Sequence, residues 1–139
     1  MGPSGREVIS SNLKNIINKK KIDFTIINGE NSADDGRGIT KEIANELFEL
    51  GVDVITSGNH IWDKKETAEF ILKEDRLLRP ANLAEGTPGK GYGIYLTKNN
   101  KFKVAVINLM GNVFMRKTDD AFLSATHIQK KIILKENAD

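Results

Sequence analysis

The stretch Phe24-Thr25-Ile26-Ile27-Asn28-Gly29-Glu30-Asn31 decides the fold of this chain, and Val52-Asp53-Val54-Ile55-Thr56-Ser57-Gly58-Asn59-His60 repeats its pattern. Each begins with mainly apolar and β-branched residues, at 24–27 and 52–56, which is typical of a strand covered on both faces in a parallel sheet. Each then leaves its strand through a glycine and polar side chains. Because the carboxyl ends of parallel strands meet at one edge, we expect the two glycine turns to be neighbours.

Amphipathic segments with helical spacing surround these strands. The predicted helices cover residues 4–21, 40–50 and 63–76 and a last segment that begins at Ser124. Ser4 and Glu7 have the spacing of a capping box at the start of the first helix. Thr40 is placed to cap the second helix, and Gly51 is placed to end it in a left-handed conformation.

The second half of the chain predicts a hairpin after a loop. Residues 85–93 contain four glycines and Pro88, so we expect a loop there. Residues 94–97 and 102–109 flank Lys98-Asn99-Asn100-Lys101, whose asparagines tolerate positive φ and favour an antiparallel hairpin. The alternation of strands and helices predicts an α/β fold with a mixed sheet flanked by helices.

Composition excludes several classes of protein. The chain has 139 residues, 21 Lys and Arg against 19 Asp and Glu, and no Cys. The balance of charge argues against a dedicated nucleic-acid surface, and the lack of Cys excludes disulfides, thiolate metal sites and a thiol nucleophile. No stretch approaches the roughly 20 apolar residues of a membrane span, and no secretory signal is present, so we expect a cytoplasmic protein with no membrane partner.

Both ends of the sequence predict a partial domain. Ile22-Asp23-Phe24 and Val52-Asp53-Val54 show how this chain runs from helices into strands, and Asn137-Ala138-Asp139 repeats that approach with no strand after it. The other end starts almost directly on a helix, whereas a buried parallel strand usually has neighbours on both sides. We therefore expect residues 1–139 to form a single partial domain that lacks a first strand and a C-terminal part.

The strand exits carry the candidate chemistry, namely Glu30, Asn31, Asn59 and His60. A carboxylate and two amide oxygens suit a divalent cation, and an adjacent imidazole can either ligate a metal or transfer a proton. Asn and Gly also make good turns without any further role. Two matched turns at one edge favour a site over two unrelated turns.

These residues resemble a known family. Gly58-Asn59-His60 is the motif of calcineurin-like metallophosphoesterases, and its context is similar to the bacterial YmdB-type subgroup. Further matching segments are Ile26 to Asn31, Gly58 to Lys65, Arg79-Pro80-Ala81-Asn82, Gly86 to Gly91 and Val106 to Gly111. The resemblance covers essentially the whole chain and implies a layered metallophosphoesterase-like sandwich.

The resemblance also implies an activity and a set of roles. The subgroup hydrolyses phosphodiesters, 2′,3′-cyclic nucleotides among them, with two divalent metal ions such as Fe, Mn or Mg. By position, Glu30 resembles the carboxylate that bridges both metals, and Asn31 and Asn59 resemble a ligand of one metal and of the other. His60 resembles the proton donor to the leaving group. The implied partner is therefore a small phosphodiester or cyclic nucleotide.

Several family features are missing from this chain. The family has a Gly-Asp turn after its first strand, a later single His ligand and a Gly-His-x-His motif, and none of them is present here. Met1 to Arg6 resembles the segment just past the missing turn, so truncation accounts for the absences and the fragment is expected to be inactive alone. We interpret His127 as an ordinary surface or rim histidine, and Trp62 as a core or lid residue in preference to a base-stacking one.

Two further hypotheses stay open from the sequence. One is a non-catalytic nucleotide-binding or regulatory α/β module, because a fold does not determine a function. The other is an interaction module whose open sheet edge pairs with another chain, which would give a homo-oligomer. Metal content separates the enzyme from the binding module, and the size of the particle in solution tests the third hypothesis.

Overall fold

A computed structural model describes residues 1–135 of the chain. Its helices are α1 (Pro3–Lys20), α2 (Lys41–Glu49), α3 (Lys65–Phe70) and α4 (Ala121–Lys135). Its strands are β1 (Ile26–Asn28), β2 (Val54–Thr56), β3 (Leu77–Leu78), β4 (Tyr92–Leu96) and β5 (Lys103–Ile107). The α/β class predicted from the sequence is confirmed.

The centre of the fold is a three-stranded parallel sheet with the order β1-β2-β3. Ile27 pairs with Ile55, so the two strands expected to be neighbours are neighbours. The burial expected for the first strand is wrong in part, because β1 is an edge strand of this sheet and Ile26 is 47% exposed. The strand also starts later than predicted, since the Asp53 carboxylate accepts the Thr25 N–H at 2.7 Å and Phe24 turns toward the Tyr95 ring.

The remaining two strands form a separate antiparallel hairpin, β4–β5. The hairpin agrees with the prediction, but the mixed sheet is not realised, because the two sheets are separate among the described residues. An isolated bridge between Leu78 and Lys90 and a bond from the Ala81 N–H to the Asn108 oxygen (2.7 Å) connect their backbones. Asn108 makes the main side-chain connection. Its buried amide donates to the backbone oxygens of Ser57 (2.8 Å) and Leu78 (2.9 Å) and so joins the end of β5 to the ends of β2 and β3.

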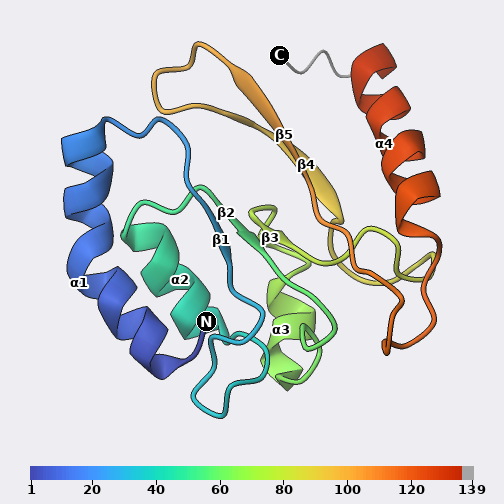
Figure 1. The fold of residues 1–139 in the computed structure, drawn as a ribbon, viewed down its shortest axis with the longest axis horizontal. Coiled ribbons are helices and arrows are strands. Elements are labelled where there is room, and N and C mark those ends of the chain that lie inside the picture. The colour runs from blue at the N-terminus through green and yellow to red at the C-terminus, as the bar shows by residue number, and fades with distance from the viewer. Residues whose placement is uncertain (136–139) are drawn as a thin grey trace.

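The layers follow from the two faces of β2. Ile55 belongs to a core cluster formed with α1, α2 and α3. Val54 packs instead with Leu78 of β3 and with Val106 of β5 in the hairpin. Figure 1 shows α1 and α2 on one side of the sheet and the hairpin with α4 on the other. No helix in the described part of the chain has both the length and the apolar character that spanning a bilayer requires.

The helix ends agree with the sequence only in part. Thr40 caps α2 by accepting the Ile43 N–H at 3.2 Å, and Gly51 has a φ of 101°, as predicted. The capping box of the first helix is wrong, because α1 begins at Pro3 with Gly2 as a cap that makes no side-chain bond. Proline is favoured at a first helical position, since its missing N–H has no partner there in any case.

Two other helices start at different residues than expected. The third helix begins at Lys65 and not at Asp63, because the Asp63 carboxylate instead contacts the ring of His60. The last helix begins at Ala121, ahead of Ser124, because Asp120 accepts the Leu123 N–H at 2.8 Å. Both differences show an aspartate side chain selecting the local structure.

The Asn108 connection leads to a stability prediction. Asn108→Leu keeps the volume of the side chain but removes both donated bonds and leaves the Ser57 carbonyl without this donor, so we expect a loss of about 1–3 kcal/mol. Urea denaturation measures the shift in midpoint at constant slope. Asn15→Leu, at an exposed position of α1, is the matched control, with an expected change within about 0.5 kcal/mol. Equal midpoints for the two variants would contradict the role given to Asn108.

Candidate active site

The turn after β1 is built around Gly29. Its N–H donates to the Thr56 oxygen at 2.9 Å, and its own oxygen accepts the Ser32 N–H at 3.2 Å. A Cβ at Gly29 would lie 2.8 Å from a methyl carbon of Ile55, so only glycine allows this close approach to β2. The Asn28 side chain accepts the Glu30 N–H at 3.2 Å and completes the turn. The sequence thus places Glu30 directly beside the neighbouring strand.

Glu30 contacts the second glycine turn. A Cβ at Gly58 would lie 2.3–2.4 Å from the atoms of the Glu30 carboxyl group, so the carboxylate occupies the space that any other residue at 58 would fill. The His60 N–H donates to Glu30 Oε1 at 3.3 Å. The two strand exits are therefore joined through one carboxylate.

The candidate residues are not all in direct contact. The backbone of Asn31 bridges to Gly38, and its side chain is exposed, with no hydrogen bond to the other candidates recorded among residues 1–135. Asn59 is half-buried and lines the cleft that also holds His60. The structure thus brings together Glu30, Asn59 and His60, and it leaves Asn31 at the open side of the first turn.

His60 is oriented by a residue that the sequence argument did not use. Its Nδ1 lies 2.8 Å from Asp63 Oδ2, with the two side chains 30% and 35% exposed. A carboxylate at this position favours the tautomer with a proton on Nδ1 and leaves Nε2 for a ligand or substrate. The spacing of three residues within a turn is the sequence signal that could have identified this pair.

His60 faces a cleft of about 290 Å³. The cleft is lined by Arg37, Asn59, His60, Trp62, Asp63, Phe114, Met115 and Arg116. A neighbouring cavity of about 230 Å³ shares Asn59 and Trp62 and extends to Thr87 of the glycine-rich loop. Trp62 packs against the main core cluster as well, which agrees with the core role expected for it.

The comparisons with known proteins place the chain in a family. The sequence profile of the YmdB-like proteins matches residues 1–139. The chain belongs to the YmdB-like family. The 2′,3′-cyclic-nucleotide 2′-phosphodiesterase of Bacillus subtilis strain 168 is 47% identical over 128 residues, which cover 92% of this chain and 47% of the relative.

Solved structures agree with the assignment to the YmdB-like family. A hypothetical protein from Thermus thermophilus matches with a TM-score of 0.85 at 32% identity over 99% of this chain and 51% of its own. A protein described as a novel phosphatase from Mycoplasma pneumoniae matches with a TM-score of 0.81 at 32% identity, covering 99% of this chain and 48% of its own. The chain spans about half the length of the curated relatives it matches.

The donor set of this YmdB-like chain fits part of a metal site. Within residues 1–135 no group of three or more His, Cys, Asp or Glu side chains is placed to hold a cation. Glu30, Asn31 and Asn59 offer one carboxylate and two amides, which are the oxygen donors that Mg²⁺ and Mn²⁺ accept. Cations of this type take about six ligands, so these residues suit such a site but need further donors to complete it.

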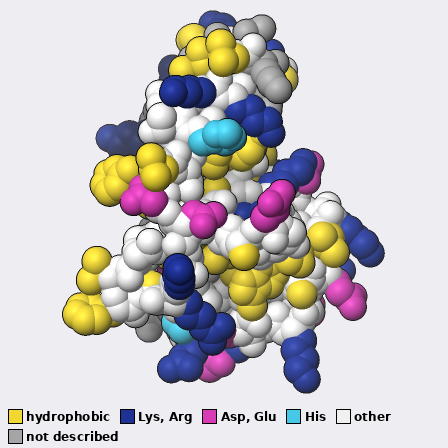
Figure 2. All heavy atoms as spheres, turned by 90° about the vertical axis from the view of Figure 1, so that its right-hand side faces the viewer, with side chains coloured by type: hydrophobic (Ala, Val, Ile, Leu, Met, Phe, Trp, Pro, Cys, Tyr) yellow, Lys and Arg dark blue, Asp and Glu magenta, His cyan; other side chains and the backbone are white. Residues whose placement is uncertain are grey.

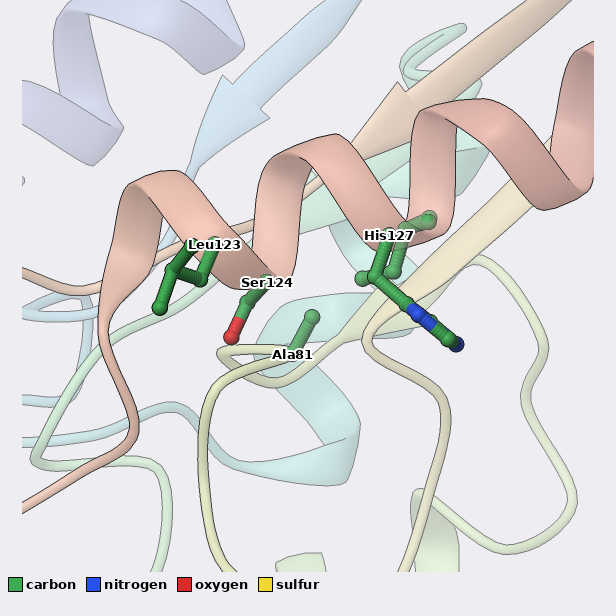
Figure 3. Close-up of a pocket in the computed structure, with 5 residues that line it drawn as sticks. Ala81, Leu123, Ser124 and His127 are labelled. Atoms are coloured by element: carbon green, nitrogen blue, oxygen red, sulfur yellow. The ribbon is translucent and has the colours of Figure 1, made fainter.

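His127 lies away from this site. It is exposed on α4 and lines a cleft of about 480 Å³ together with Ala81, Leu123, Ser124 and Ile128, none of which lines the His60 cleft. Figure 3 shows Leu123, Ser124 and His127 along one side of α4, facing the segment of Ala81. The interpretation of His127 as a rim histidine agrees with this position.

Proposed function

We propose that residues 1–139 form a partial domain of a metal-dependent phosphodiesterase that hydrolyses phosphodiesters such as 2′,3′-cyclic nucleotides. One observation carries the proposal: the Glu30 carboxylate lies on Gly58 and accepts the His60 N–H, so it connects the two exits that hold the candidate ligands and the candidate acid. The name of the Bacillus subtilis relative supports the substrate class.

In this proposal each residue has a separate task. Glu30, Asn31 and Asn59 would hold two divalent cations, which when bound supply Lewis-acid polarisation of the phosphoryl group. In its doubly protonated form, His60 donates the Nε2 proton to the leaving oxygen as the P–O bond breaks, while its Nδ1–H stays bonded to the Asp63 carboxylate. Asp63 holds the ring in place through Nδ1.

The number of ligands limits what this chain does alone. Three protein donors shared between two cations leave most coordination positions to water, so we expect weak metal binding and no measurable hydrolysis of 2′,3′-cyclic AMP by residues 1–139 alone. A chain lengthened to the span of its relatives is expected to hydrolyse it. Tight binding of two Mn²⁺ ions by the 139-residue chain would contradict the expectation that it has too few metal ligands.

Metal titration tests the ligand assignment. Glu30→Gln keeps the shape of the side chain and an oxygen for the His60 N–H but removes the charge, so Mn²⁺ affinity should fall at least about tenfold. Glu69→Gln, on the exposed side of α3, is the matched control and should leave affinity unchanged. Equal affinities for both variants would remove Glu30 from the ligand set.

Nucleotide binding without any hydrolysis in the lengthened chain would favour a non-catalytic binding module.

A further inference from the structure

Two arginines in the His60 cleft have no part in the proposed proton transfer. Arg37 comes from the loop after β1 and Arg116 from the segment between β5 and α4, and both side chains are exposed and line the cleft. Within residues 1–135, neither guanidinium has a recorded hydrogen bond or ion pair, and Arg37 is held only through its backbone N–H, which donates to Asp35 at 3.2 Å. Two segments far apart in sequence thus bring free positive charge to one cleft.

The nearby acids do not neutralise these arginines. Asp34 pairs with Arg6, Asp35 with Lys64 at 2.7 Å, and Asp63 with His60 at 2.8 Å. The hydrogen bond from Lys64 is the largest cause of a lowered pKa at Asp35, so this carboxylate stays ionised and paired with Lys64. None of these three carboxylates pairs with Arg37 or Arg116, so both guanidinium groups are available to an anionic ligand.

Both loops that carry the arginines are anchored. A Cβ at Gly38, the residue after Arg37, would lie 2.7 Å from the backbone oxygen of His60, so the first loop packs directly on the site. The buried Asn82 amide holds the base of the second loop, since it donates to the oxygens of Met110 (2.7 Å) and Asp119 (2.9 Å) and accepts the Met110 N–H (3.0 Å). The two arginines therefore extend from loops whose backbones are held in place.

Phe114 lines the same cleft as Arg37 and Arg116, at its rim. It has a φ of 57°, a left-handed conformation that a phenylalanine rarely adopts, and its side chain is fully exposed, at 103%. Neither backbone preference nor burial therefore explains an aromatic residue here. On the face of the molecule that Figure 2 shows, apolar side chains project beside Lys and Arg side chains.

We propose that this cleft binds a mononucleotide, with Arg37 and Arg116 on its phosphate group and Phe114 stacked on its base. Guanidinium groups bind phosphate in a planar, two-bond geometry, and a base stacks on any exposed aromatic ring. The cleft volume of about 290 Å³ suits a small ligand and not a polymer. The inference rests on the proposed function for placing that phosphate beside His60.

Binding to the 139-residue chain in EDTA tests the proposal without any metal. The probes are inorganic phosphate and adenosine 3′-monophosphate, followed by calorimetry. Arg37→Gln and Arg116→Gln should each weaken both probes about tenfold, because each removes a charged hydrogen bond. Phe114→Ala should weaken adenosine 3′-monophosphate roughly tenfold and leave phosphate unchanged. Arg37→Lys and Arg116→Lys keep the positive charge but lose the planar two-bond geometry, so each should recover only part of the lost affinity. Phe114→Trp keeps a stacking ring and should retain most of the affinity for adenosine 3′-monophosphate.

Controls separate the outcomes. Lys14→Gln removes one exposed charge on α1 and should change neither affinity, and circular dichroism checks that every variant is folded. Wild-type affinity in both Arg→Gln variants would overturn the phosphate assignment, and an equal loss of both probes in Phe114→Ala would overturn the stacking role. Tighter binding of a single-stranded oligonucleotide than of the mononucleotide would overturn the ligand class. A lengthened chain that fails to hydrolyse would refute the proposed function and leave these binding results in place.

Discussion

Replacing His60 with alanine is expected to lower kcat by roughly 10²–10⁴-fold in a chain lengthened to the span of its YmdB-like relatives. The reason is that Nε2 is the ring nitrogen left available for the leaving oxygen when Nδ1 lies 2.8 Å from Asp63. The measurement is steady-state hydrolysis of 2′,3′-cyclic AMP together with the metal content of the purified protein. Metal content should stay near that of the wild type, because His60 is proposed as a proton donor and not as a metal ligand.

Two further variants make the His60 result specific. His127→Ala removes the other histidine, which lies on α4 outside the cleft, and should leave kcat unchanged. Asp63→Asn keeps His60 but weakens its orientation, so the fall in kcat should be smaller than for His60→Ala. If His60→Ala loses metal in proportion to activity, His60 is a ligand. If turnover does not change, it has no place in the reaction.

The second large effect is expected from Gly58→Ala. The new Cβ would lie 2.3 Å from Glu30 Oε1, and this carboxylate is the end of a flexible side chain, so it can swing away at little cost in stability. The movement displaces the central candidate ligand, and a misplacement of about 1 Å at a catalytic group can cost about 10²-fold in rate. We therefore expect kcat to fall by about 10²-fold or more while the unfolding midpoint changes little.

Other glycines provide the comparison for Gly58→Ala. Gly111→Ala meets no atom within 4 Å and should alter neither rate nor stability. Gly91→Ala places its Cβ 2.3 Å from the Cα atom of Ala81, which cannot move aside as a side chain can, so it should lower stability by about 1–3 kcal/mol. A Gly58→Ala variant that destabilises like Gly91→Ala and keeps its rate would show that Glu30 is structural only.

The sequence predicts those elements whose signals are local. The Thr40 cap needs only the spacing to Ile43, and the hairpin needs only the turn at 98–101 between two apolar runs. Strand β3 escapes prediction because two residues, Leu77 and Leu78, are too few to show a period. The sequence favours a helix start at Asp63, because nothing in it indicates that His60 lies within reach of that carboxylate.

The site is predictable to the extent that it follows from strand order. Glu30 and His60 come together because β1 and β2 are parallel neighbours, which the two buried runs indicate. Arg37, Phe114 and Arg116 are not identified from the sequence, because they lie on irregular segments whose meeting depends on Gly38 and on the buried Asn82. Irregular segments carry no periodic signal, so the arginine side of the cleft can be found only in three dimensions.

The connection made by Asn108 also constrains the order of folding. The hairpin closes over a short turn, whereas the Asn108 amide reaches back across 51 residues to Ser57 and across 30 residues to Leu78. Closing larger loops costs more chain entropy and slows the step that depends on them. We therefore expect the hairpin to form early on its own and to dock onto the ends of β2 and β3 later. In that order of folding, the exit of β2 at Ser57 gains its bond from the Asn108 amide only once the hairpin has docked.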